Sequence, residues 1–121
     1  MSASKRILVV DDEEDVRIFL KDFLDERELE VRTASNGMEA LHVLETFSAD
    51  IVLLDIMMPV MDGFECLKQI KKKYPQTTVV MITAMKEENR IEQAQRLGAH
   101  NYILKPFSLN YLESELSKLI Q

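Results

Sequence analysis

Five side chains that could take part in chemistry stand at the ends of four short apolar stretches of the chain. They are Asp11, Asp12, Asp55, Thr83 and Lys105. Three carboxylates brought together would repel one another unless a cation neutralised them, and carboxylate oxygens in an open cleft are suitable ligands for Mg²⁺. With a lysine and a hydroxyl beside them, such groups suit phosphoryl transfer, in which a carboxylate can itself be the nucleophile.

Each of these residues also has a simpler explanation when it is taken alone. Asp11 and Asp12 could only cap a helix, because aspartate is a favoured capping residue. Thr83 could be an ordinary strand residue with a satisfied hydroxyl, and Lys105 could be solvated. The combination is more specific than any member, because compatible groups at four strand ends rarely coincide by chance.

The positions of these groups depend on strands and helices that alternate five times along the chain. We expect strands at residues 7–10, 30–34, 51–54, 78–83 and 101–104. This alternation with short connections predicts an α/β domain with a single doubly wound, five-stranded parallel sheet of flavodoxin-like order 2-1-3-4-5. The polar strand 30–34 should lie at an edge. All strand ends of a parallel sheet meet at one rim, so the five side chains should converge there.

The helices differ in how much apolar surface they present. The first has Asp12 as its expected cap and a stripe with helical spacing, made of Val16, Phe19, Leu20, Phe23 and Leu24. Asn36 and Asp62 should begin the second and third helices. The fourth, roughly residues 87–97, is weakly apolar. The last has a stripe made of Leu109, Leu112, Leu116, Leu119 and Ile120.

Composition limits the kind of protein and its partners. The chain has 121 residues, of which 46% are hydrophobic and 30% charged, so we expect one domain over residues 1–121. Its formal net charge of −6 argues against nucleic-acid binding by this chain itself. Stretches of about 18 apolar residues, which a membrane span needs, do not occur. The single cysteine, Cys66, excludes an internal disulfide and fits the cytoplasm.

Four motifs together resemble a known family. Val-Val-Asp11-Asp12, Leu-Leu-Asp55-Ile-Met-Met-Pro-Val-Met-Asp-Gly63, Ile-Thr83-Ala and Leu-Lys105-Pro-Phe are similar to those of the receiver domain of bacterial two-component response regulators. The resemblance covers essentially the whole chain. It implies a phosphoacceptor domain that does not turn over a separate substrate and that signals to a downstream effector protein.

The resemblance also implies roles for single residues. Asp55 would accept a phosphoryl group from a histidine kinase or a histidine phosphotransfer protein. Asp11, Asp12 and Asp55, with the backbone carbonyl of Met57, would hold Mg²⁺ or Mn²⁺. Lys105 would pair with Asp55 and then with its phosphate.

A switch is implied as well. Thr83 would follow the phosphoryl oxygen while Tyr102 swings inward, and the Lys105–Pro106 bond would be cis, which only X-Pro bonds adopt at low cost. The weakly apolar fourth helix should move with them, so we expect activation to change residues 84–90.

Two further hypotheses concern lifetime and docking. Met57 and Met85 stand two residues after Asp55 and Thr83, where thioethers cannot orient a water, so we expect slow self-dephosphorylation. Ile18, predicted to point away from the core, and the Pro106–Phe107 pair flank the acidic site, where a phosphodonor helix would dock.

Other functions remain open from the sequence. A haloacid-dehalogenase-like phosphatase also forms an aspartyl phosphate, but its Asp-x-Asp motif would need an aspartate at position 13, where this chain has Glu13. A phosphorylation-independent adaptor is a second alternative. The chain could also be the receiver of a longer DNA-binding regulator, and we expect a monomer or weak dimer.

Overall fold

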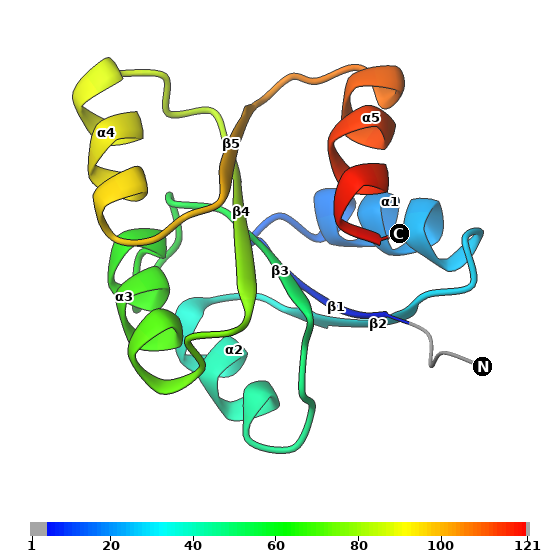
Figure 1. The fold of residues 1–121 in the computed structure, drawn as a ribbon, viewed down its shortest axis with the longest axis horizontal. Helices are drawn as coiled ribbons and strands as arrows, with labels where there is room; N and C mark the ends of the chain where they lie inside the picture. Colours follow the sequence, from blue (N-terminus) through cyan, green and yellow to red (C-terminus); the bar gives the residue numbers. More distant parts are fainter. Residues whose placement is uncertain (1–4, 121) are drawn as a thin grey trace.

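Strands and helices alternate strictly in the computed structural model, which describes residues 5–120 (Figure 1). The strands are β1 (Arg6–Val10), β2 (Glu30–Ala34), β3 (Ile51–Leu54), β4 (Thr78–Thr83) and β5 (Asn101–Leu104). The helices are α1 (Glu14–Asp25), α2 (Gly37–Leu44), α3 (Gly63–Lys73), α4 (Glu88–Arg96) and α5 (Leu109–Ile120). The predicted elements are therefore present, although residues 1–4 and 121 of the expected domain lie outside the described part.

All strands pair in parallel in the order β2-β1-β3-β4-β5, which confirms the predicted fold class and the edge position of β2. The register aligns Val10 of β1 with Ala34 of β2 and with Leu54 of β3. Because these residues are the last of their strands, the loops after them all leave from one rim of the sheet. The chemistry expected from the sequence depends on that alignment.

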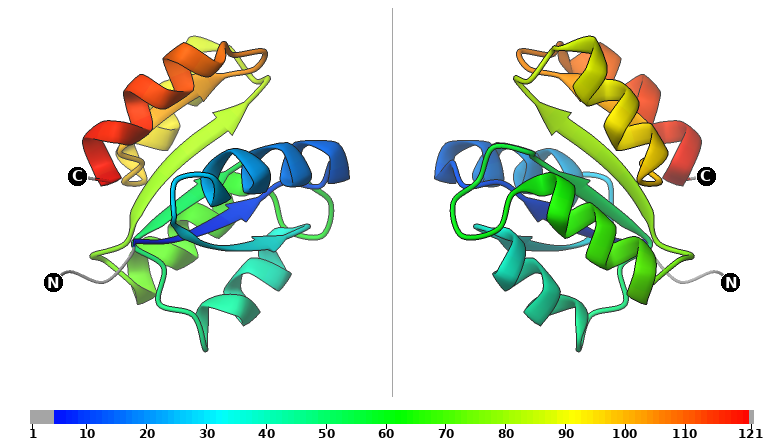
Figure 2. Two further views of the ribbon diagram at one scale, coloured as in Figure 1. Left: turned by 90° about the vertical axis from the view of Figure 1, so that its right-hand side faces the viewer. Right: turned by 90° about the vertical axis from the view of Figure 1, so that its left-hand side faces the viewer.

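Helices cover both faces of the twisted sheet (Figure 2). Alternate strand side chains point to opposite faces, so each central strand supplies two separate cores. On one face the strands pack against α2, α3 and α4, with Leu54 and Met81 among the buried residues. On the other face they pack against α1 and α5, with Leu53 and Ile82 buried. Because β3 and β4 are buried on both faces, they hold the residues at their carboxyl ends in fixed positions.

Local signals at the helix starts were partly correct. The side chains of Asn36 and Asp62 accept hydrogen bonds from the amides of Glu39 and Glu65, as predicted. The Asp12 prediction is wrong: α1 has Glu13 at its N-cap, and no side chain makes a capping bond there. Backbone geometry decides which residue occupies the N-cap, so the preference of aspartate for this position placed the start of α1 one residue too early.

Two expected core residues lie at the surface. Phe19 is 44% exposed and Leu109 is 50% exposed, although both fit the apolar spacing of their helices. Phe19 is exposed because its ring lies beside Phe107 of the loop after β5, with ring centroids 6.4 Å apart, and not in the core between α1 and the sheet. Ile18 and Tyr111 are exposed, as predicted. None of the helices within residues 5–120 has the length and apolar character that crossing a membrane requires.

Candidate functional site

The carboxyl rim of the sheet brings the predicted residues together. Asp11 and Asp55 each continue the sheet pattern by one bond, since their amides donate to the carbonyls of Ala34 (3.1 Å) and Val10 (3.0 Å). The amide of Lys105 likewise donates to the carbonyl of Thr83, at 2.8 Å. These backbone bonds extend the sheet to the reactive side chains, so their directions are set by the strands and not by flexible loops.

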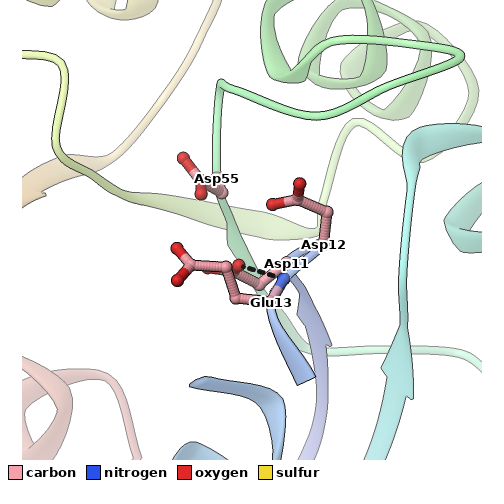
Figure 3. Close-up of side chains that lie close together, drawn as sticks. All are labelled: Asp11, Asp12, Glu13 and Asp55. Atoms are coloured by element: carbon pink, nitrogen blue, oxygen red, sulfur yellow. Dashed lines mark hydrogen bonds between the residues drawn. The ribbon is translucent and has the colours of Figure 1, made fainter. Parts of the chain in front are cut away.

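Four carboxylates form the centre of the site (Figure 3). Asp11, Asp12, Glu13 and Asp55 each offer an oxygen, and these oxygens lie within 4.8 Å of one another. Asp11 and Asp55 are only 2% and 5% exposed, whereas Asp12 and Glu13 are exposed. A partly buried, partly open set of carboxylates fits a hard divalent cation such as Mg²⁺. Sequence reasoning missed Glu13, although its position next to the aspartate pair was the available signal.

Lys105 lies against this cluster and connects its members. Its Nζ donates to Asp11 Oδ2 at 2.7 Å and to Asp55 Oδ2 at 3.1 Å, and it lies 3.6 Å from a Glu13 oxygen. Burial opposes the charge of the ammonium, but the hydrogen bond to Asp11 and the charges of Asp55 and Asp11 outweigh it and raise the pKa of Lys105. The lysine is therefore a fixed positive charge beside Asp55.

Asp11 is the most enclosed carboxylate of the cluster. Burial raises its pKa, while hydrogen bonds from Lys105 and from the Glu13 amide act in the opposite direction. The Glu13 amide donates to Asp11 Oδ1 at 2.9 Å, drawn as the dashed line in Figure 3. Burial outweighs these donors, so the net effect is a raised pKa for Asp11 in a place where water is largely excluded.

The loop after Asp55 is held close to the strand. The amide of Met57 donates to Asp55 Oδ1 at 3.2 Å, and the amide of Gly63 donates to the carbonyl of Ile56 at 2.8 Å. A Cβ at Gly63 would lie 2.2 Å from the Asp55 carbonyl oxygen, so only glycine allows α3 to begin so close to the acceptor strand. The start of α3 and the position of Asp55 are therefore coupled.

The predicted switch residues, Thr83 and Tyr102, both make hydrogen bonds to the backbone of Met85. Thr83 is fully buried, and its Oγ1 accepts a hydrogen bond from the Met85 amide at 3.3 Å. The hydroxyl of Tyr102 donates to the Met85 carbonyl at 2.5 Å. Burial, followed by the charges of Glu87 and Asp55, raises the pKa of Tyr102. The Lys105–Pro106 bond is cis, as predicted.

An apolar groove borders the acidic cluster. It has a volume of about 490 Å³ and includes Phe19, Pro106 and Phe107 among its lining, with Glu13 and Asp15 also present. Two of the predicted docking residues, Pro106 and Phe107, therefore line a real hollow. Ile18 is 51% exposed but is not among the lining residues, and its neighbour Phe19 takes that place.

Comparison with known proteins decides the family. The family model described as the response regulator receiver domain matches residues 7–117. The chain belongs to this family. A receiver domain is a phosphoacceptor signalling domain of two-component systems, so the resemblance drawn from the sequence is confirmed.

Sequence relatives support the same family. The receiver domain is 36% identical to the chemotaxis protein CheY of Halobacterium salinarum, over 86% of this chain and 87% of that protein. It is 39% identical to the regulatory protein AtoC of Escherichia coli, over 100% of this chain but 26% of AtoC. The chain spans half or less of the length of several curated relatives, including AtoC.

One solved structure bears on the metal. The response regulator TrrA of Thermotoga maritima, in complex with Mg²⁺ and BeF, is 38% identical to this receiver domain with a TM-score of 0.85, covering 95% of this chain and 98% of that one. These matches favour a receiver domain over a haloacid-dehalogenase-like phosphatase.

Proposed function

We propose that Asp55 is the phosphoacceptor of this receiver domain and takes its phosphoryl group from a histidine kinase or a histidine phosphotransfer protein. One observation carries the proposal: a buried carboxylate at the end of β3 shares the ammonium of Lys105 with Asp11, inside a cluster of four acids. An oxygen of Asp55 forms the new O–P bond as the N–P bond of a phosphohistidine breaks, and the donor imidazole keeps the electron pair of that bond.

Asp11, Asp12, Asp55 and the backbone carbonyl of Met57 would hold Mg²⁺, or Mn²⁺ in its place. When bound, the cation neutralises charge on the phosphoryl oxygens. The donor set fits, because the carboxylate oxygens are hard ligands that already lie close together. Lys105 supplies a second positive charge next to Asp55. The lysine ammonium would remain within reach of the phosphoryl oxygens once Asp55 is phosphorylated.

The direct test uses acetyl phosphate with Mg²⁺ and intact-mass measurement. We expect one phosphoryl group per chain on the wild type and none on Asp55→Asn, because the amide is not a nucleophile of comparable strength. Labelling that needs no Asp55 would contradict the proposal. Steady release of phosphate from a phosphate ester, beyond one equivalent, would instead support the phosphatase alternative, and normal signalling by Asp55→Asn would support the phosphorylation-independent adaptor.

Thr83 and Tyr102 act as the switch in this proposal. Both bind the backbone of Met85, so a turn of the Thr83 hydroxyl toward a phosphoryl oxygen would release the Met85 amide and shift the carbonyl that anchors Tyr102. Beryllofluoride with Mg²⁺ should therefore change amide exchange in residues 84–90. Unchanged exchange there, with beryllofluoride bound at Asp55, would contradict this part.

Met57 and Met85 set the lifetime of the phosphate in the second part of the proposal. Neither side chain can donate a hydrogen bond to an attacking water. The side chain of Met57 is 58% exposed beside Asp55, where it can cover an approach to the phosphate. Met57→Asn with Met85→Glu should accelerate loss of the phosphoryl group, and an unchanged rate would contradict the idea.

The apolar groove beside the acids is the proposed docking surface for the phosphodonor helix. Pro106 and Phe107 line it, and exposed Ile18 lies on the same helix as Phe19. Ile18→Ala should slow transfer from a histidine donor while labelling by acetyl phosphate stays unchanged. Met38→Ala is a matched control, since Met38 is comparably exposed at 53% but lies on α2 and lines no hollow with Pro106 or Phe107. Equal slowing of both labelling reactions would point to a damaged site instead.

We also infer the setting in which this chain works. Residues 1–121 form one receiver domain, which acts in the cytoplasm as a monomer or weak dimer and contacts proteins and not nucleic acid. The net charge of −6 supports the last point, and the three consecutive lysines, residues 71–73, fall in the last turn of α3, where cations complement the helix dipole. Sedimentation of the phosphorylated and unphosphorylated chain measures the oligomeric state.

A further inference from the structure

Arg17 connects helix α1 to the end of strand β1. Its Nη1 donates a hydrogen bond to the main-chain carbonyl of Asp11 at 2.8 Å, across six residues of sequence. Arg17 itself is partly buried, and the proposed roles of the acids, the lysine and the switch residues do not use it. The contact is therefore a polar connection into the site from a residue outside the acidic cluster.

Every polar group of Asp11 is engaged by a different part of the molecule. Its amide donates to Ala34 of β2, and its carboxylate accepts from the Glu13 amide and from Lys105. The carbonyl accepts from Arg17. Asp11 is only 2% exposed, so water has little access to its carbonyl. Without Arg17, this carbonyl would therefore lose its hydrogen-bond donor and water would not readily replace it.

The start of α1 makes this connection more important. Glu13 occupies the N-cap without a side-chain capping bond, unlike Asn36 and Asp62 at the starts of α2 and α3. Two other bonds hold the loop of residues 11–13: the Glu13 amide donates to Asp11 Oδ1, and Arg17 donates to the Asp11 carbonyl. The planar guanidinium of Arg17, which has several donors in a fixed arrangement, is the one of the two that ties the body of α1 back to the strand.

We infer that Arg17 is a positioning residue for the acidic loop of residues 11–13, and that it thereby sets the affinity of the site for a divalent cation. By fixing the Asp11 carbonyl, it keeps the carboxylates of Asp11 and Asp12 close to that of Asp55, as binding of one cation requires. This inference rests on the proposed function, because it assumes that Mg²⁺ binds to this cluster.

The sign of the effect separates positioning from simple electrostatics. A guanidinium near the acids repels a cation, so removal of its charge alone would tighten Mg²⁺ binding. Positioning predicts the opposite, since a loosened loop spends less time with its carboxylates converged. Supporting residues around metal ligands typically change affinity by about 10- to 100-fold, which is large enough to measure against the electrostatic effect.

The experiment is a Mg²⁺ titration of the full chain, followed by the amide shifts of residues 11–13 and 55. We expect Arg17→Met to bind Mg²⁺ at least tenfold more weakly than the wild type. Lys21→Met is the matched control: it removes the same charge from the same helix, but Lys21 pairs with Asp25 at 2.6 Å. Its affinity should stay at the wild-type value. Arg17→Lys, which keeps the charge and a donor, should recover part of the loss.

Each outcome decides between the inference and the function on which it rests. Mg²⁺ binding by Arg17→Met that is equal to or tighter than the wild type would overturn the positioning role while leaving the proposed function intact. Failure of the wild type itself to bind Mg²⁺ would overturn both. If Arg17→Met does not fold, Arg17→Gln is titrated in its place with the same expected weakening, and wild-type affinity there would overturn the inference.

Discussion

Helices α3 and α4 cover the same face of the sheet as neighbours, yet they are held very differently. Arg90 of α4 lies over the ring of Phe64 of α3, 5.9 Å from its centroid. Helix α3 starts with a side-chain cap from Asp62 and has four buried residues, whereas α4 starts without one and buries only Ala94. The buried residues of α3 are Gly63, Cys66, Leu67 and Ile70.

The difference separates a fixed part of the molecule from a responsive one. The start of α3 packs against the backbone of Asp55, so the phosphoacceptor and its helix form one rigid unit. The loop before α4 contains Met85, which binds both Thr83 and Tyr102, and α4 itself has few buried contacts that resist movement. Chemistry and response are thus assigned to neighbouring elements of unequal stability.

The largest expected effect comes from the contact that fixes α3. Gly63→Ala would place a methyl group 2.2 Å from the Asp55 carbonyl oxygen, which the surrounding backbone cannot accommodate without moving. We expect a loss of more than about 3 kcal/mol in the free energy of unfolding, or failure to fold. Urea denaturation measures it. Gly37→Ala should cost less, because a methyl group there would lie 2.9–3.0 Å from its nearest atoms, all in Met61, and equal losses would contradict the rigid unit.

Thiol labelling compares the opening of the two helices directly. Burial, with Asp62 and Glu65 nearby, raises the pKa of Cys66 to about 12, so its thiol stays protonated and slow to react in the folded chain at pH 8. Ala94→Cys in a Cys66→Ala background places a thiol at an equally buried position of α4. We expect this thiol to react at least about tenfold faster, equivalent to about 1.4 kcal/mol less opening free energy. Equal rates would remove the contrast.

Changing the N-cap residues should make α3 less stable and α4 more stable. Asp62→Ala removes the acceptor for the Glu65 amide and should cost about 1 kcal/mol. Glu87→Ala should cost less than about 0.5 kcal/mol, because Glu87 makes no side-chain capping bond. Glu87→Asp should stabilise α4 by up to about 1 kcal/mol and reduce the exchange change that beryllofluoride causes in residues 84–90. Thermal unfolding and amide exchange are the two measurements.

The smallest effect concerns strain in the loop between Asp55 and α3. Val60 has a φ of +71°, in a region that β-branched residues rarely adopt, and the Met61 amide donates to the Pro59 carbonyl at 2.8 Å across it. Val60→Gly should raise the free energy of unfolding by about 0.5 kcal/mol, since glycine relieves this strain but gains entropy when unfolded. Val60→Ala should gain less. Denaturation that shows no difference would mean that the loop carries no strain.

Much of the fold was predictable because its signals are local. Buried parallel strands are short continuous apolar runs, and the groups after them, such as Asp55 and Lys105, fall on one rim once the order is known. The helix stripes were less reliable. Phe19 keeps the correct spacing but faces Phe107, because periodicity assigns a face of a helix without saying how far the neighbouring elements extend over it.

Sequence alone determined the family, the parallel order of the strands and the aspartates that meet at the carboxyl rim. The family depends on local motifs, and the order depends on the strict alternation of strands and helices and on which strands are most apolar. Only the tertiary structure decided that Glu13 joins the acidic cluster, that Lys105 lies closer to Asp11 than to Asp55, and that Arg17 binds back to the strand. These contacts join side chains whose directions depend on backbone geometry at helix starts and loops, and neither composition nor spacing records that geometry.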